Sequence, residues 1–375
     1  MLVVDLVEGG VVHHAAQINR LHDENTVLRQ QLFDPAHRVV QFLQMEEHAR
    51  RRDDLGRTQV RQDVVGTGFV EELTPCRDAS VPRQLGDVCR GLHPQYAAAE
   101  AGVLFQPSPV VAADIDAVYV ATPHQLHASN SILALNAGKP VLCEKPFAVN
   151  GQQAQEMIDA AQKNQKLLME AMWSRYLPHY QLIRKKISAG ELGELLIINA
   201  DHGQPLPAEK YYRLHAPELA GGALLDLGIY PLSLAFMLLG KPDQIKAVGT
   251  KTESGVDATT SAVLHFPSGA QALINTTLTT KTPCTASIIG TKGRIEIDGD
   301  FYTPTSMRWI DSEGTVTEFP RDYQGHGIRE QALYFESALK NGQLESEYLP
   351  LSESLAIMSA MDEMRRQIDL RYPCE

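Results

Sequence analysis

Three short polar motifs in the middle of the chain bring together residue types that can take part in chemistry. They are Thr122-Pro123-His124, Glu144-Lys145-Pro146 and Trp173-Ser174-Arg175. Each follows an apolar run that is typical of a buried strand. The carboxyl ends of parallel strands lie at one edge of a sheet, and ligands bind at that edge in open α/β folds. The three motifs therefore predict one ligand site at a sheet edge.

Lys145 is well suited to a chemical role. A lysine at a strand end beside a proline has little backbone freedom, which suits a group that must be held in place for a reaction. Cis prolines are retained in tight turns, so we expect a cis bond before Pro146. His124 and His127 stand one helical turn apart, but no third ligand is recognisable nearby, so we expect no metal.

The elements that must position these motifs alternate between strands and helices from about Asp114. Strands are predicted in "DIDAVYVATP", "KPVLCEKP" and "KLLMEAMW". Helices are predicted in "QLHASNSILALNAG", "GQQAQEMIDAAQKNQ" and "YLPHYQLIRKKISAG". Such alternation implies right-handed βαβ units and hence an α/β, Rossmann-like parallel sheet.

The pattern changes after Leu192. The stretch "GGALLDLGIYPLSLAFMLLG" is a strongly apolar helix, and strands are expected near 244–251, 259–266, 270–280, 284–290 and 293–298. Two late helices are expected near 326–341 and 351–369. We therefore expect an α+β domain with a large open antiparallel sheet. Its uncovered face favours a homodimer or a higher homo-oligomer.

The chain is long enough for two domains. We expect an atypical N-terminal segment at 1–85, a partial dinucleotide-binding domain at 86–175 and a substrate and oligomerisation domain at 176–375. The C-terminal helix is a candidate for packing back on the dinucleotide-binding domain.

Composition argues against several classes of protein. The formal net charge is -12 and the one basic run, Arg50–Arg52, is followed by two aspartates, so no nucleic-acid partner is expected. Five cysteines without a CxxC pair argue against a disulfide framework and favour a reducing compartment. The first residues lack the basic lead of a secretory signal, and no apolar run of membrane length is recognised. We therefore expect a cytoplasmic protein without a membrane partner.

Several separated motifs, in the same order, resemble one family of enzymes. They are "DAVYVATPHQLHASNSILALNAGKPVLCEKPFAVN", "MEAMWSRYLP", "GGALLDLGIYPL", "ESGVDATTSAVLHFPSG" and "IIGTKGRIEI". Together they resemble the glucose-fructose oxidoreductase and inositol dehydrogenase (Gfo/Idh/MocA) family. The similar branch holds dimeric dihydrodiol dehydrogenase, NADP-dependent xylose dehydrogenase and anhydrofructose reductase. The resemblance starts at about Asp114 and reaches the C-terminus.

The resemblance implies hydride transfer between a nicotinamide ring, of NADP or else NAD, and a hydroxyl or carbonyl carbon of a sugar or cyclic diol. It implies that Lys145 orients or polarises the substrate oxygen and that Tyr230 donates or accepts the proton. Asp226, four residues earlier on the same helix, is the expected orienting group. A nearby lysine is expected to lower the pKa of Tyr230. The resemblance also implies cofactor contacts from Thr122, Pro123, His124, His127, Glu144, Lys145, Trp173 and Arg175.

The phosphate-binding loop of a dinucleotide domain is the feature that the sequence does not clearly contain. Gly66 and Gly68 have the right spacing, but Glu71 stands where a small residue is wanted. Arg90 is a candidate for meeting the 2′-phosphate of NADP. Before Lys139 there are eleven arginines and no lysine. This first part is therefore either a divergent segment or a frame-shifted reading joined to an enzyme, and peptides from residues 1–100 in mass spectrometry would decide.

Two functional interpretations follow. The first is an NADP-preferring oxidoreductase. The alternative is a non-catalytic homologue that lacks a working phosphate loop and acts in sensing or assembly. The phosphate loop discriminates between them, because a chain without it should bind the cofactor poorly.

Overall fold

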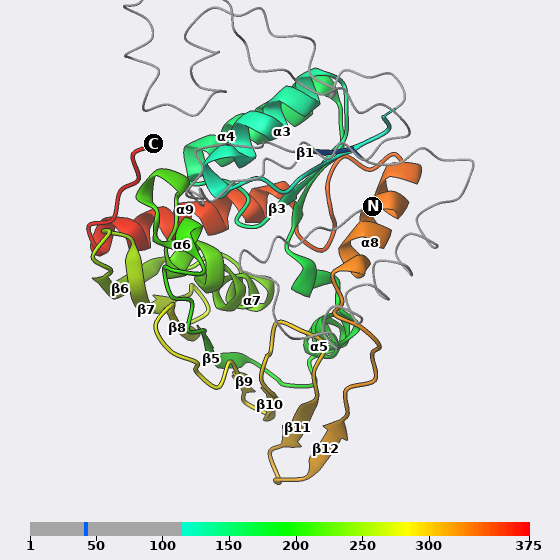
Figure 1. Ribbon diagram of the computed structural model, residues 1–375. Coiled ribbons are helices and arrows are strands. Elements are labelled where there is room, and N and C mark those ends of the chain that lie inside the picture. The colour runs from blue at the N-terminus through cyan, green and yellow to red at the C-terminus, as the bar shows by residue number, and fades with distance from the viewer. Residues whose placement is uncertain (1–40, 44–114) are drawn as a thin grey trace, which may run out of the picture. The chain divides into compact units, whose positions relative to one another are not determined.

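The structure, a computed structural model, describes residues 41–43 and 115–375 (Figure 1). The first strands of this part of the chain form a parallel four-stranded sheet. The predictions for Gly66, Gly68 and Arg90 lie outside the described residues. The strand order is β1-β2-β3-β4, and every neighbouring pair is parallel. The strands are Gln41–Leu43 (β1), Val118–Val120 (β2), Val141–Glu144 (β3) and Leu168–Ala171 (β4). This confirms the predicted Rossmann-like sheet, to which β1 adds a strand that was not predicted.

Helices join these strands and cover the sheet. They are His127–Asn136 (α3), Gly151–Asn164 (α4) and, after β4, Pro178–Ser188 (α5). Figure 1 shows α3 and α4 side by side. Val118 and Cys143 pack into the core that holds α3 and α4, whereas Tyr119 and Leu142 pack with Phe335 on the other face. Because both faces are covered, the strands read as continuous apolar runs.

Local residues explain where these helices start and stop. The Asn150 side chain caps α4 by accepting a hydrogen bond from the Gln153 N–H at 2.8 Å. Gly138 follows α3 with φ at +75°, a conformation that favours glycine and that ends the helix as predicted. Pro178 begins α5, where its missing N–H costs nothing.

The second sheet has eight strands in the order β12-β11-β10-β9-β5-β8-β7-β6. All neighbouring pairs are antiparallel except β5 and β8, so the sheet is mixed rather than wholly antiparallel. The strands are Leu195–Gly203 (β5), Gln244–Lys251 (β6), Asp257–His265 (β7), Gln271–Thr277 (β8), Ala286–Gly290 (β9), Gly293–Ile297 (β10), Met307–Asp311 (β11) and Val316–Phe319 (β12). The five predicted strands are present, whereas β5, β11 and β12 were not predicted.

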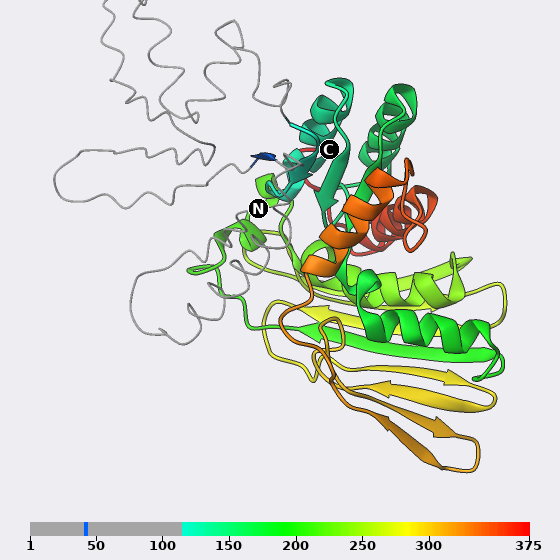
Figure 2. The ribbon, with the colours of Figure 1, turned by 90° about the vertical axis from the view of Figure 1, so that its right-hand side faces the viewer.

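Helices cover one face of this second sheet, as Figure 2 shows. They include Ile229–Leu239 (α7), which packs on β5 and β8, and Leu351–Gln367 (α9), which packs on β6. The remaining helices are Tyr212–His215 (α6) and Arg329–Lys340 (α8). Helix α9 also packs on α4, where the Gly151 N–H donates to the Asp362 carboxylate at 2.8 Å. All described residues belong to one compact unit of the chain. The predicted domain boundaries at 85 and 175 stay predictions.

The segment around α7 is the most apolar in the described part of the chain. Pro217–Leu239 is long and apolar enough to cross a membrane by length and composition. The prediction that no run has this property was therefore wrong. However, 83% of its apolar window is buried inside the protein, which is typical of a core helix.

Candidate active site

The first two motifs are joined by His127. One of its ring nitrogens, Nδ1, lies 2.7 Å from the Pro146 carbonyl oxygen, and Nε2 lies 2.8 Å from the Thr122 carbonyl oxygen. Burial lowers the pKa of His127 to about 3, so the ring is neutral at physiological pH and its single N–H donates to only one of the two carbonyl oxygens. The peptide bond between Lys145 and Pro146 is cis, as predicted. The segments that follow β2 and β3 thus lie on either side of one buried imidazole.

Asp226 gathers three cationic or basic groups around one carboxylate oxygen. Its Oδ1 lies 3.2 Å from Lys145 Nζ, 3.2 Å from Arg213 Nη2 and 3.5 Å from His124 Nε2. Lys145 also donates to the Asp226 backbone oxygen at 2.9 Å. Burial would raise the pKa of Asp226, but Lys145, Arg213 and His124 together hold it well below the usual range. Asp226 therefore orients Lys145, whereas the sequence predicted that it orients Tyr230.

Tyr230 lies beside this group. The Lys145 Nζ is 5.3 Å from the centre of the Tyr230 ring, and the Trp173 indole N–H donates to the Tyr230 hydroxyl oxygen at 2.9 Å. Burial raises the pKa of Tyr230, and the Trp173 hydrogen bond opposes this only in part. The net shift is therefore opposite to the lowering that was predicted from a nearby lysine, because burial outweighs the groups that favour the anion. Tyr230 is a neutral phenol, which is the form that donates a proton.

The helix that carries Asp226 and Tyr230 starts with a π-helical turn, Leu224–Gly228, before α7. Single π turns are frequent at functional sites. The Asp257 carboxylate on β7 accepts a hydrogen bond from the Leu224 N–H at 2.7 Å and so fixes the start of this turn. Gly222 has φ at +113°, and a Cβ there would lie 2.1 Å from Asp257 Oδ1. The glycines of "GGALLDLG" therefore allow the close packing that positions the site.

Arg175 of the third motif, Trp173-Ser174-Arg175, bonds to other parts of the protein, whereas a cofactor contact was predicted for it. The short 3-10 helix Trp173–Tyr176 follows β4 directly. Each guanidinium nitrogen of Arg175 donates to a protein acceptor: Nε to Ser233 Oγ, Nη1 to the Tyr348 oxygen and Nη2 to the Ser233 oxygen and Glu353. Arg175 is 1% exposed. Its donors are therefore taken up inside the protein, in contrast to the predicted cofactor contact.

The remaining predicted residues lie close to this centre. His124 is buried and its Nδ1 lies 2.9 Å from the Ala220 carbonyl oxygen. Burial lowers the pKa of His124 despite the nearby Asp226 carboxylate. Glu144 accepts a hydrogen bond from the hydroxyl of Tyr119 on β2. Thr122 is buried at the end of β2.

Sequence reasoning missed a polar and aromatic wall beside Tyr230. His202, at the end of β5, stacks on Tyr302 with ring centres 4.1 Å apart and lies 5.2 Å from the Tyr230 ring. The Gln204 amide donates to His202 Nε2 and to the Tyr302 hydroxyl, each at 2.9 Å. Burial lowers the pKa of His202 to about 4, so it is neutral and can accept this bond. His326 lies over Trp173 with ring centres 4.9 Å apart.

One signal for this wall was present in the sequence. The run "LLIINADHG" is an apolar stretch that turns into alternation and has a histidine as its last residue but one, which is the pattern of a strand with a polar end. Tyr302 and His326 come from loops and are placed by long-range packing, so no local pattern marks them. Within residues 41–43 and 115–375, no group of three or more His, Cys, Asp or Glu residues could hold a metal ion.

Comparisons with known proteins agree with this geometry. Residues 94–172 match the family described as "Oxidoreductase family, NAD-binding Rossmann fold", and residues 180–296 match the "GFO/IDH/MocA C-terminal domain". A D-xylose 1-dehydrogenase (NADP(+)) from Hypocrea jecorina is 37% identical over 298 residues, covering 71% of this chain and 76% of that protein. A trans-1,2-dihydrobenzene-1,2-diol dehydrogenase from Xenopus tropicalis is 36% identical over 269 residues, covering 69% and 80%. The crystal structure of an aldose-aldose oxidoreductase from Caulobacter crescentus, complexed with glycerol, has a TM-score of 0.64 at 26% identity and covers 77% of this chain and 87% of that one.

The fold and the site define an NAD(P)-dependent oxidoreductase that acts on a carbon bearing a hydroxyl or carbonyl group. The chain belongs to the Gfo/Idh/MocA oxidoreductase family, and its relatives match the branch that its motifs resemble. These relatives favour the enzyme over the non-catalytic alternative. NADP is the cofactor that they indicate.

The described residues fit the nicotinamide end of such a cofactor. The ends of β2 and β3 carry polar groups at one sheet edge, where a bound nucleotide meets an α/β sheet. The side-chain oxygen of Gln125, which follows the first motif, is buried and has no hydrogen-bond partner within the described part of the chain. A ligand with a donor group would satisfy it. The candidates for holding the phosphates, Gly66, Gly68 and Arg90, lie outside the described residues.

Proposed function

We propose that this chain uses NADP to interconvert a hydroxyl and a carbonyl group on a sugar or cyclic diol. In this proposal Tyr230 is the proton donor and acceptor, and Lys145 is the group that polarises the substrate oxygen. The observation that carries it is the convergence of Lys145 and Tyr230, which lie 85 positions apart in the chain yet have the ammonium 5.3 Å from the ring centre.

Each residue contributes a distinct part of the chemistry. The cofactor, when bound, supplies or accepts the hydride. Asp226 holds the Lys145 ammonium at 3.2 Å, so the lysine charge stands beside the phenol without a further reorganisation cost. A neutral buried phenol protonates a developing alkoxide, and the reverse reaction returns the proton to Tyr230. His124 and Arg213 share the charge of Asp226 and keep it ionised.

The wall beside Tyr230 supports a polyhydroxylated substrate. The Gln204 amide nitrogen bonds to His202 and to the Tyr302 hydroxyl oxygen, so the Gln204 side-chain oxygen and the Tyr302 hydroxyl proton are the groups that suit hydrogen bonds to sugar hydroxyls. The rings of Trp173 and Tyr302, with centres 6.3 Å apart, add apolar faces. A pocket that combines apolar faces with a few placed polar groups is typical of small-molecule sites. A sugar is therefore the substrate class that we propose first, and a cyclic diol the second.

The test is a titration of the purified full chain with NADPH and with NADH, followed by nicotinamide fluorescence. We expect saturable binding that is tighter for NADPH. Tyr230→Phe should keep this binding and reduce turnover of aldoses by about 10²-fold or more, the usual contribution of a positioned general acid. The absence of binding at millimolar nucleotide, or unchanged turnover in Tyr230→Phe, would contradict the proposal.

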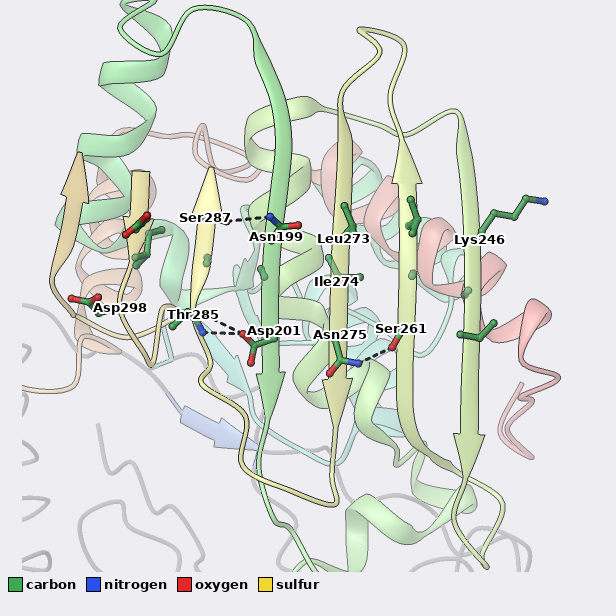
Figure 3. Close-up of a pocket in the computed structure, with 18 of the residues that line it drawn as sticks. Asn199, Asp201, Lys246, Ser261, Leu273, Ile274, Asn275, Thr285, Ser287 and Asp298 are labelled. Atoms are coloured by element: carbon green, nitrogen blue, oxygen red, sulfur yellow. Dashed lines mark hydrogen bonds between the residues drawn. The ribbon is translucent and has the colours of Figure 1, made fainter. Parts of the chain in front are cut away.

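We further propose that the open face of the eight-stranded sheet joins two copies of this chain. Figure 3 looks onto this face, which forms a hollow of about 870 Å³. Polar side chains in it pair with one another, as Asn275 does with Ser261 at 2.7 Å and Asn199 with Ser287 at 3.3 Å. Apolar side chains are also exposed to a partner on this face: Val263 and Leu273 are each 42% exposed. Exposed apolar area on a sheet face is a feature of protein interfaces.

The charges on this face suit a second copy rather than a different partner. Lys246 lies on the edge strand β6, and Asp298 lies past β10 on the far side of the hollow, 3.7 Å from Arg308 of β11 (Figure 3). In a two-fold pair the same patch meets itself, so a patch that holds charges of both signs can complement its own copy. Light scattering during size-exclusion chromatography should give twice the chain mass of 41.4 kDa.

A matched pair of variants tests this interface. Val263→Asp, in the hollow, should give the monomer mass. Val316→Asp, on the edge strand β12 and 50% exposed, should leave the mass unchanged. A monomeric wild type, or a Val263→Asp variant with unchanged mass, would contradict this proposal. A cytoplasmic location without membrane or nucleic-acid partners is also proposed, on the acidic composition and on the free thiols of Cys143, Cys284 and Cys374.

A further inference from the structure

We propose that Trp173 is a positioning residue that fixes the hydroxyl of Tyr230, rather than a cofactor contact. This inference rests on the proposed role of Tyr230. The indole Nε1 lies 2.9 Å from the Tyr230 hydroxyl oxygen, and the two side chains are 5% and 6% exposed. Their rings meet edge to face, with centres 6.3 Å apart and planes at 80°.

The chemistry of the indole determines the direction of this hydrogen bond. An indole N–H donates and cannot accept, so the Tyr230 oxygen is the acceptor. The phenol therefore keeps its own proton for another partner. Within the described residues the Tyr230 hydroxyl has no hydrogen-bond partner except Trp173. The phenol proton is thus reserved for a group that binds in the site, which is the substrate oxygen.

The backbone around Trp173 is anchored to the same helix as Tyr230. Arg175, two residues later, donates to the Ser233 hydroxyl at 2.8 Å and to the Ser233 carbonyl at 2.7 Å. Ser233 is three residues after Tyr230, so both lie on one side of α7. Glu353 on α9 pairs with Arg175 at 2.5 Å. Two contacts from one short 3-10 helix thus set the register between the end of β4 and the helix that carries the phenol.

The indole also acts on the energetics of proton transfer. A donor at the phenol oxygen stabilises the phenolate more than the phenol, because hydrogen bonds to charged groups are stronger. This acts against burial, which raises the pKa of Tyr230. Trp173 therefore makes the phenol a better acid and holds its oxygen in one place.

Kinetics separate this role from that of a cofactor contact. Trp173→Phe keeps the ring and removes the donor. We expect kcat to fall about ten-fold, the loss of one hydrogen bond to a charged group, with the NADPH Kd unchanged within about two-fold. In a Tyr230→Phe background the same change should have no further effect on kcat, because its target is gone. Trp309→Phe on β11, outside the site, is the matched control and should leave both constants unchanged.

A second readout needs no turnover. The chain has two tryptophans, so a 1H–15N spectrum shows two indole N–H resonances. Trp309→Phe assigns them. We expect Tyr230→Phe to shift the Trp173 resonance and to leave that of Trp309, which lies against Lys186, in place. An unmoved Trp173 resonance, or a Trp173→Phe variant that weakens NADPH binding at constant kcat, would overturn the positioning role. Failure of the proposed function can be told apart from failure of the positioning role. If the proposed function is wrong, the wild-type chain binds no nicotinamide nucleotide, and Trp173 then has no catalytic role either. The Trp173 resonance would still report the contact with Tyr230 in that case.

Discussion

The two sheets of this protein serve a ligand in different ways, and their burial explains the difference. Every residue of β4 is buried, whereas β7 alternates between buried and more exposed positions. The parallel sheet is packed on both faces, so it offers a ligand only its strand ends. The mixed sheet is covered on one face, so its other face is free for a partner. Chemistry is therefore expected at the ends of one sheet and assembly on the face of the other.

The site nevertheless draws on both parts. Lys145 follows the strand β3 of the parallel sheet, whereas Tyr230 comes from α7, which packs on the mixed sheet. Their relative position depends on the contacts that join these elements, above all Trp173 with Tyr230 and Arg175 with Ser233. The different roles of the two sheets can be tested with variants that change the strand ends of the parallel sheet, the contacts between the two parts, or the open face of the mixed sheet.

The largest effect is expected at the end of β3. Lys145→Met removes the charge that polarises the substrate oxygen, and we expect kcat to fall by about 10²–10³-fold, as for the loss of one group that stabilises a developing oxyanion. NADPH binding should persist. Steady-state kinetics with an aldose and a nucleotide titration measure the two quantities. Lys139→Met, which removes a lysine that bonds the Ile115 carbonyl instead, is the control. A Lys145→Met enzyme with wild-type kcat would remove the lysine from the mechanism.

A smaller effect, on stability, is expected where α9 meets the end of β4. Glu353→Gln leaves the guanidinium of Arg175 buried without its carboxylate, and we expect the free energy of unfolding to fall by about 3 kcal/mol. Urea unfolding measures it. Glu363→Gln breaks the exposed pair with Arg366 on the same helix, and this change should cost far less stability than Glu353→Gln. Equal losses in the two variants would contradict a special role for the Arg175 pair.

A further stability effect depends on pH. Burial lowers the pKa of His202 from 6.5 to about 4. Between these values the unfolded chain binds a proton that the folded chain does not, so stability falls as the pH is lowered from 6.5 toward 4 and levels off below. The contribution of His202 is about 1 kcal/mol per pH unit. His202→Phe should therefore show a shallower decline of unfolding free energy with acid, and parallel curves for the two proteins would refute this.

The smallest effect concerns the open face. Val263→Asp is expected to separate the subunits but to change turnover per subunit by less than about two-fold, because surface changes away from the site are usually small. Chromatography with light scattering and kinetics at one protein concentration measure both. A large loss of turnover in the monomer would show that catalysis at the ends of the parallel strands depends on assembly through the face of the mixed sheet.

Sequence reasoning located the strand ends well because buried parallel strands are continuous apolar runs. It also identified Lys145, Asp226 and Tyr230, which the structure brings together. It missed β5, although "LLIINADHG" carries a strand pattern. It assigned Asp226 to Tyr230 from helical spacing, yet the carboxylate pairs with Lys145 on another element. The direction of the Tyr230 pKa shift depends on burial, which no local pattern reveals.

Residues far apart in the chain are the ones that could not be predicted. Tyr302 and Arg213 lie in segments without a motif, and only the folded chain brings them to His202 and Asp226. The domain boundaries, the site roles and the features predicted between residues 44 and 114 stay predictions.

The most direct test of the central claim is a double-mutant cycle on Lys145 and Tyr230. The claim is that both act on one substrate oxygen, so kcat is measured for Lys145→Met, Tyr230→Phe and the double variant. Groups that act as a unit have non-additive effects. We expect the double variant to be about as slow as the slower single variant. A double variant whose loss is the product of the two single losses would contradict the claim.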